Sequence, residues 1–122
     1  MTRDPFEALE ALIACGVNRV LTSGQRDRAE DGAELLSKLV RIAAGRIVVM
    51  GCGGLRPDNV AAILAQTKLE EIHFAALRDV PSGMSYRNAD VGMGGSDLDR
   101  EYRNTITDGD IIAATIAAAR PR

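Results

Sequence analysis

Aromatic residues are scarce in this sequence, which has two Phe, two Tyr and no Trp among 122 residues. Histidine and cysteine are also rare, with one His and two Cys, at positions 15 and 52. The core must therefore be built from Ala, Val, Ile and Leu. Two such cysteines provide neither a disulfide framework nor a zinc-site spacing, so we expect a reduced protein in the cytoplasm.

The chain also lacks an excess of charge of one sign. Its 15 Lys and Arg and 17 Asp and Glu give a formal net charge of −2, with both signs mixed along the sequence. A nucleic-acid-binding protein needs a clustered basic face. No apolar run approaches the roughly 18 residues of a membrane span, and the first residues contain no apolar signal core. We therefore expect neither a nucleic-acid partner nor a membrane partner.

Helical and strand patterns alternate along the chain. We expect helices from Asp4-Pro5 to Gly16 and at 33–45, 57–67 and 110–119, and strands at 17–24, 46–54 and 69–77. Strands separated by helices indicate right-handed βαβ units and a parallel sheet. These strands are apolar on both faces, as buried parallel strands are. The sequence therefore predicts an α/β fold in a single domain, residues 1–122.

The segment 78–97 has four glycines and no periodicity. We expect a loop there, and a loop of about 20 residues in a compact domain is usually functional or mobile. Its residues Tyr86, Arg87 and Asn88 can bind an anionic substrate or fold over it. A solvated loop is the equal alternative.

A glycine-rich turn, in VVMGCGGLRPDNV at 48–60, follows the second expected strand. Ligands of parallel α/β folds bind beyond the carboxyl ends of the strands. Without a Cβ atom, Gly51, Gly53 and Gly54 let backbone N–H groups approach an anion, and the following helix start favours negative charge. Alternatively, these glycines only permit a tight strand-to-helix turn. The sequence leaves the two interpretations even.

Two other strand ends carry small residues. Ser23 and Gly24 follow the first expected strand, and Ala75 and Ala76 close the third. If the three strands are neighbours, all three turns share one edge of the sheet. The sequence therefore predicts an anion-binding edge, to which Arg87 from the long loop can contribute.

His73 is the candidate catalytic residue because the pKa of imidazole lies near neutrality. A hydrogen-bonded histidine in the core or at the sheet edge is the plainer alternative. Cys52 is the weak candidate for a metal ligand, since copper(I) prefers soft sulfur atoms. It lies in no Cys-x-x-Cys or Met-x-x-Met spacing.

Four segments resemble the C-terminal half of the CutC family of copper homeostasis proteins. They are GVNRVLTSGQ, VVMGCGGLRPDNV, EIHFAALRDVPSGMSYRN and REYRNTITDG, in that order along the chain. The resemblance implies a TIM-type (β/α) barrel, a cytoplasmic oligomer and a role in copper homeostasis. It carries over Ser23 and Gly24, the glycines at 51, 53 and 54, and His73.

A closed eight-stranded barrel needs at least about 200 residues, and the first half of the family, where its copper-linked cysteines mainly lie, has no counterpart here. We therefore expect a partial barrel of about three parallel strands with flanking helices. Open strand edges should pair with a second copy, forming a homo-oligomer, or with a missing N-terminal half.

Three functions remain open from the sequence. The first is copper handling, with copper implied by the resemblance alone. The second is an enzyme or sensor of a small phosphorylated or carboxylated metabolite at the strand edge. The third is an inactive barrel fragment.

Overall fold

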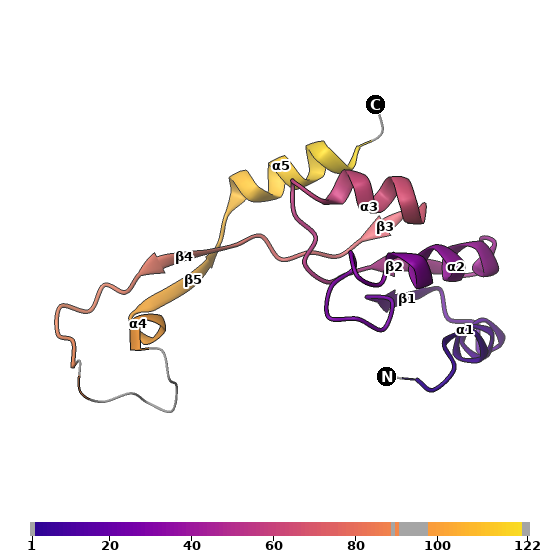
Figure 1. Ribbon diagram of the computed structural model, residues 1–122, viewed down its shortest axis with the longest axis horizontal. Coiled ribbons are helices and arrows are strands. Elements are labelled where there is room, and N and C mark those ends of the chain that lie inside the picture. The colour runs from indigo at the N-terminus through magenta and orange to yellow at the C-terminus, as the bar shows by residue number, and fades with distance from the viewer. Residues whose placement is uncertain (1, 89, 91–97, 121–122) are drawn as a thin grey trace.

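A computed structural model describes residues 2–88, 90 and 98–120, and its main body is a three-stranded parallel sheet with helices (Figure 1). The strands β1 (Arg19–Thr22), β2 (Val48–Gly51) and β3 (Glu71–Ile72) pair in the order β1-β2-β3. The helices of the body are α1 (Pro5–Ala14), α2 (Ala33–Ala43), α3 (Val60–Thr67) and α5 (Gly109–Ala119). The predicted α/β class, with three parallel strands and flanking helices, is confirmed.

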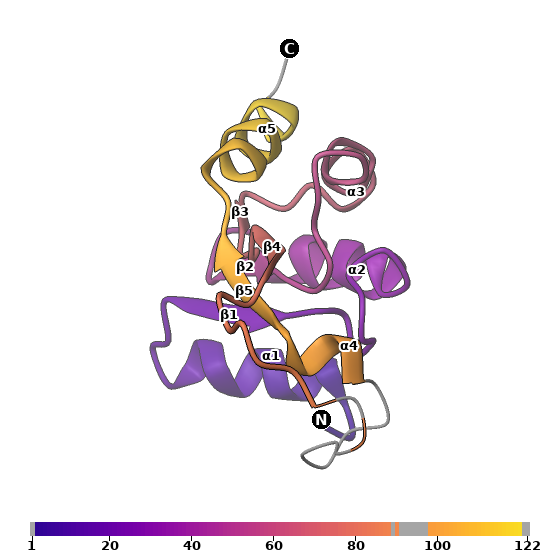
Figure 2. The same ribbon diagram turned by 90° about the vertical axis from the view of Figure 1, so that its left-hand side faces the viewer.

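The sheet follows the sequence order of its strands, each pairing with the next. Both crossover helices, α2 and α3, pack together on one face, and α5 packs beside α3 (Figures 1 and 2). Sequential βα units with their helices on one face are the arrangement of part of a (β/α) barrel.

The core lies between the sheet and these helices. Val49 of β2 is buried, and around it lie buried aliphatic residues of the helices and loops: Leu9, Leu36, Leu39, Leu55, Val60, Ile63 and Leu69. The opposite face of the sheet carries Leu21, Met50 and Glu71 in register, and Leu21 is 54% exposed. One face of the sheet is therefore covered, and the other is open.

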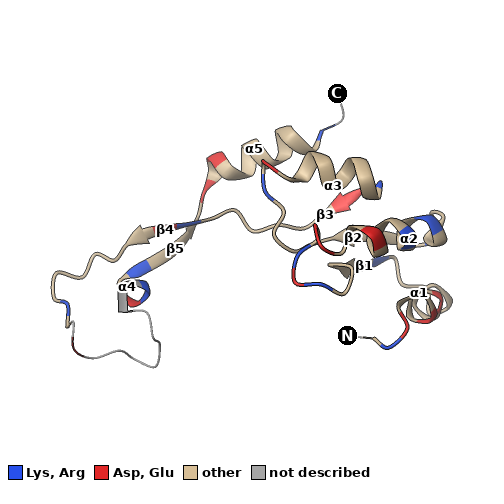
Figure 3. Cartoon of the chain, in the orientation of Figure 1, with Lys and Arg blue, Asp and Glu red and all other residues tan. Residues whose placement is uncertain are grey.

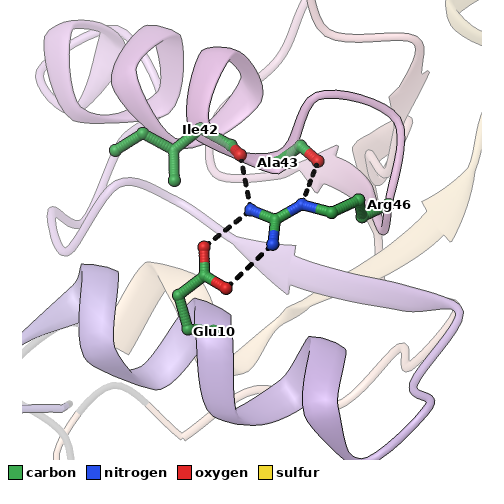
Figure 4. A network of polar contacts seen from close by, with 4 residues as sticks. All are labelled: Glu10, Ile42, Ala43 and Arg46. Atoms are coloured by element: carbon green, nitrogen blue, oxygen red, sulfur yellow. Dashed lines mark hydrogen bonds and ion pairs between the residues drawn. The ribbon is translucent and has the colours of Figure 1, made fainter.

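Glu10 of α1 and Arg46 of the α2–β2 turn form the polar contact that joins these two parts of the chain (Figure 4). The Arg46 guanidinium donates at 2.6 and 2.9 Å to the two carboxylate oxygens of Glu10. It also donates to the carbonyl oxygens of Ile42 and Ala43 at the end of α2. The hydrogen bond from Arg46 lowers the pKa of Glu10. This contact links α1 to the end of α2.

The predicted starts of α1, α2 and α5 agree with the structure to within one residue, whereas the start of α3 is wrong. The predicted ends of α1 and α2 are two residues too late, and α2 ends at Ala43 because Ala44 and Gly45 have left-handed backbone angles. Asp4 caps α1 as predicted, accepting from the amides of Phe6 and Glu7. The predicted helix 57–67 begins only at Val60, because the side chain of Asn59 closes a turn ahead of it.

The loop predicted at 78–97 is wrong in part, because its first residues form a strand. β4 (Leu77–Pro81) pairs antiparallel with β5 (Arg103–Thr107), and the short helix α4 (Leu98–Glu101) precedes β5. Residues 91–97 of the predicted loop lie outside the described residues. We call β4 and β5 the hairpin arm, which projects from the body (Figures 1 and 2). The predicted strand at 69–77 shortens to β3, and 73–76 lead into the arm.

Acidic and basic residues are interspersed over the elements, whereas α3 and most of α5 carry no charge (Figure 3). Within the described ranges, no helix has the length and apolar character to cross a membrane.

Candidate functional site

The carboxyl ends of β1, β2 and β3 meet at one edge of the sheet, which we call the rim (residues 22–25, 51–54 and 73–76). The amide of Cys52 donates to the carbonyl oxygen of Thr22 at 3.1 Å, and the amide of His73 donates to that of Gly51 at 2.8 Å. These hydrogen bonds join neighbouring turns. The structure therefore brings Ser23, Gly24, the glycine-rich turn and His73 to the same side of the molecule.

The glycine-rich turn leaves the sheet in a backbone conformation that favours glycine. Gly53 and Gly54 have φ angles of 105° and 67°. The carbonyl oxygen of Gly53 accepts from the amide of Ala29 at 2.8 Å, which packs loop 25–32 against the turn. The amides of Gly53 and Gly54 donate to no acceptor in the described part of the chain. The turn therefore carries two backbone donors without an acceptor in the described part of the chain.

Asn59 holds the far side of this turn. Its side-chain oxygen accepts from the amide of Arg56 at 2.8 Å, and its side-chain nitrogen donates to the carbonyl oxygen of Gly54 at 2.9 Å. Because α3 starts after this turn, its N-terminus is not adjacent to the glycines as predicted.

Packing explains two of the other predicted glycines. Gly24 is buried with a φ of 70°, and a Cβ atom there would collide with the carbonyl oxygen of Gly32. A Cβ on Gly51 would meet the side chain of Leu69. Gly24 and Gly51 therefore fit the turn-and-packing interpretation. Ser23 is half-buried, and its hydroxyl has no hydrogen-bond partner among the described residues.

Arg28, in the loop that packs against the glycine-rich turn, is a residue that sequence reasoning did not select. Its Nε lies 3.3 Å from the position that a Cβ of Gly54 would occupy. The side chain is exposed and has no ion pair within the described ranges. The basic residues in GQRDRAEDG, at 24–32, were the available signal, but only the fold places one of them against the glycine turn.

Of the remaining predicted anion-binding residues, Ala75 and Ala76 lie at the rim and Arg87 lies beyond the hairpin arm. Ala76 is buried and its carbonyl oxygen accepts from the amide of Asp108, whereas Ala75 is exposed at the rim. Arg87 lies on the segment that continues the arm, and its guanidinium carbon stacks 5.0 Å from the ring centroid of Tyr102. The structure therefore does not bring Arg87 to the rim.

His73 follows β3 directly and its side chain is exposed. Its imidazole makes no hydrogen bond to any other described residue. Two residues earlier, Glu71 accepts a bidentate hydrogen bond from Arg19 across the open face of the sheet, at 2.8 and 2.9 Å. That hydrogen bond lowers the pKa of Glu71. The polar groups near the end of β3 are thus one fixed ion pair and one unengaged imidazole.

Cys52 is half-buried at the rim and lines a cavity of about 340 Å³ between α1 and the sheet. The cavity wall is mostly apolar, with Leu9, Leu12 and Leu21 among its residues. Burial raises the pKa of the Cys52 thiol, which disfavours the thiolate that binds metals. Among the described residues, no three His, Cys, Asp or Glu side chains gather as a metal-binding group.

A comparison with known protein families shows to which family this chain belongs. The sequence profile of the CutC family matches residues 1–78. The chain belongs to the CutC family. This membership confirms the resemblance predicted from the four sequence segments.

Two CutC relatives show how much of a family protein this chain spans. A CutC family protein of Mesorhizobium japonicum is 67% identical over 120 residues, which cover 98% of this chain and 46% of the relative. The copper homeostasis protein cutC homolog of Mus musculus is 43% identical over 108 residues, covering 88% of this chain and 40% of the relative. The chain thus spans about half the length of these relatives.

A crystal structure of a CutC protein from Streptococcus agalactiae aligns with 57% of this chain and 34% of its own. The sequence identity is 25%, and the TM-score is 0.49.

Proposed function

We propose that this CutC family chain binds a small phosphorylated or carboxylated metabolite at the rim. The observation that carries the proposal is the pair of unpaired amides on Gly53 and Gly54 beside the Arg28 guanidinium. Backbone amides at positive-φ glycines form a concave donor set for oxyanions, and arginine adds a charged fork that matches phosphate and carboxylate oxygens.

Other rim groups complete this proposed site. The unengaged Ser23 hydroxyl can donate a further hydrogen bond to an anion. His73 lies on the neighbouring turn and is the group that can exchange a proton with a bound ligand.

Titration calorimetry with inorganic phosphate tests the rim proposal. We expect saturable binding that Arg28→Ala weakens about tenfold or more, because a hydrogen bond to a charged group contributes about 1.5–3 kcal/mol. Arg41→Ala, at the last turn of α2, is the matched control and should leave the affinity unchanged. If both substitutions weaken phosphate binding equally, the effect comes from the net charge of the protein, and Arg28 does not form a specific anion site.

A role in copper handling is the second candidate, taken from the name of the mouse relative. The feature that favours it is the position of the Cys52 thiol at the rim, one residue after Gly51. Copper(I) prefers such soft sulfur ligands, and its binding would offset the cost of deprotonating a half-buried thiol. Among the described residues, Cys52 is the one thiol at the rim, so a copper(I) site there needs ligands besides this thiol.

Competition with a copper(I) chelator tests this second candidate. If Cys52 is a ligand, Cys52→Ala should abolish copper(I) binding while Cys15→Ala, at the end of α1, should retain it. Binding that survives Cys52→Ala would exclude a copper site at the rim. Failure of both phosphate and copper to bind would favour the third hypothesis, a barrel fragment without activity of its own.

A further inference from the structure

The cavity between α1 and the sheet adjoins the rim. It holds about 340 Å³, and two of its lining residues, Ser23 and Cys52, are themselves rim residues. Small-molecule sites are concave, mostly apolar, and about 300–1,000 Å³ in volume, with a few polar groups that orient the ligand. The rim and the cavity therefore form one continuous surface, which is polar at the rim and apolar beyond it.

The cavity is elongated along α1. This helix lies along β1 (Figure 2), and the lining extends on it from Pro5 to Leu12, about 10 Å at 1.5 Å per residue. Gln25, beyond the carboxyl end of β1, donates from its side-chain nitrogen to the carbonyl oxygen of Thr2 at 2.8 Å. The start of α1 thus lies at the rim and Leu12 lies away from it. This shape fits an extended aliphatic chain that enters from the rim.

The polar groups of the lining differ in whether they already have hydrogen-bond partners. Gln25 and Thr2 are bonded to each other, and the Thr22 hydroxyl accepts from a backbone amide at 3.1 Å. The Ser23 hydroxyl and the Cys52 thiol have no hydrogen-bond partner among the described residues. The polar side chains of the cavity that can still bind a ligand therefore lie where it meets the glycine-rich turn.

We infer that the rim and this cavity together bind an amphiphilic anion, a straight aliphatic chain that carries a carboxylate or phosphate head group. This inference rests on the anion site proposed above and adds the chain to it. The head group binds to the amides of the glycine-rich turn, the Ser23 hydroxyl and Arg28. The chain lies in the cavity against Leu9 and Leu12.

Titration calorimetry with matched short and long ligands tests this inference. The pairs are acetate with octanoate and inorganic phosphate with octyl phosphate, and the head group that binds more tightly in both pairs is the one that the site prefers. Burial of a methylene contributes about 0.8 kcal/mol, or about fourfold in affinity. We therefore expect each long ligand to bind at least about tenfold more tightly than its short partner.

The possible failures of this titration are distinguishable. If the short ligands bind and the long ones bind no more tightly, the cavity holds no chain and only the proposed anion site remains. If neither short nor long ligands bind, the anion site itself is wrong. If octanol binds as tightly as octanoate, the rim does not hold a head group, and the inference is overturned.

Filling the cavity tests where the chain lies. Ala8→Leu enlarges a half-buried side chain of the cavity lining, and Ala11→Leu makes the same change at an exposed position of the same helix. Ala8→Leu should remove the advantage of octanoate over acetate and leave the affinity for acetate unchanged, whereas Ala11→Leu should change neither. An advantage that survives Ala8→Leu would place the chain outside the cavity and overturn the inference.

Alkylation of the two native cysteines gives a readout that needs no substitution. Cys52 lines the cavity, whereas Cys15 is exposed at the end of α1 and is not part of the lining. Saturating octanoate should slow the reaction of Cys52 with iodoacetamide and leave that of Cys15 unchanged, as measured by peptide mass spectrometry. A Cys52 reaction rate that octanoate does not change would overturn the inference.

Discussion

At the scale of single residues, the glycines of this chain differ in what their missing Cβ atom permits. At Gly24, the missing Cβ makes room for the backbone of Gly32. Gly45 has a similar φ angle, 77° against 70°, but nothing lies within 4 Å of the Cβ position. An alanine at Gly45 would therefore lose stability only through the left-handed backbone, whereas an alanine at Gly24 would also collide with Gly32.

We expect Gly24→Ala to reduce the free energy of unfolding by at least about 2 kcal/mol more than Gly45→Ala. Gly45→Ala should cost about 1–2 kcal/mol, the penalty of placing Cβ in the left-handed region. Gly24→Ala adds a backbone displacement to that penalty. Urea denaturation of both variants measures the difference. Equal losses would mean that loop 25–32 moves away freely and does not pack on β1.

The Arg19–Glu71 ion pair predicts a pH dependence of stability. Its hydrogen bond lowers the pKa of Glu71 in the folded protein. The stabilisation is therefore present above the unfolded pKa of glutamate, about 4.3, and is lost as the pH falls through the lower folded value. The difference in thermal midpoint between the wild type and Arg19→Gln should thus shrink from pH 7 towards pH 3.

A control for this pH series is Arg41→Gln, whose guanidinium has no ion pair among the described residues. Its difference from wild type should stay nearly constant over the same range. If the difference in thermal midpoint between the wild type and Arg19→Gln is the same at acidic pH, the ion pair does not stabilise the sheet.

At the scale of elements, local sequence signals predicted the helices better than the strands. Asp4-Pro5 marks the start of α1, because a capping carboxylate and a proline in the first turn act within a few residues. Pro57 gave the same signal for α3. The side chain of Asn59 instead hydrogen-bonds to the backbone of Gly54 and Arg56, and the helix begins only at Val60. That outcome depends on the shape of the glycine turn, which residue spacing does not encode.

The hairpin arm could not be predicted for a different reason. β4 and β5 pair across more than 20 intervening residues, and neither strand has a buried face that would impose alternating hydrophobicity. The rim was predicted because parallel strands end at one edge whatever the loops do. Arg28 was missed because its loop folds back onto the glycine turn only in three dimensions.

Asp108 allows a test of how the arm is joined to α5. Asp108→Ala removes both the α5 cap and the Arg78 ion pair, whereas Asp4→Ala removes only the cap of α1. We therefore expect Asp108→Ala to lower the thermal midpoint more than Asp4→Ala, and to increase amide hydrogen exchange in β4 and β5. Unchanged exchange in the arm would contradict its anchoring through Asp108.

At the scale of the whole molecule, the described residues leave one face of the sheet open and the outer edges of β1 and β3 unpaired. Leu21 lies on the open face at 54% exposure. Apolar surface of this kind is commonly covered by another chain. We therefore predict that the thermal midpoint rises with protein concentration, because association stabilises the folded state.

Leu21→Ser tests whether the open face takes part in this association. It should weaken the concentration dependence, whereas Ile42→Ser, at a 38% exposed position on α2, should not. A midpoint independent of concentration in the wild type would refute self-association altogether. A response of Ile42→Ser alone would place the contact on the helical side.

Amide chemical shifts during a phosphate titration show most directly whether the rim amides receive an anion. We expect the resonances of Gly53 and Gly54 to move together and saturate, while that of Gly45, at the far end of β2, stays in place. Resonances of Gly53 and Gly54 that remain still at saturating phosphate, or that move no more than that of Gly45, would contradict anion binding at the rim.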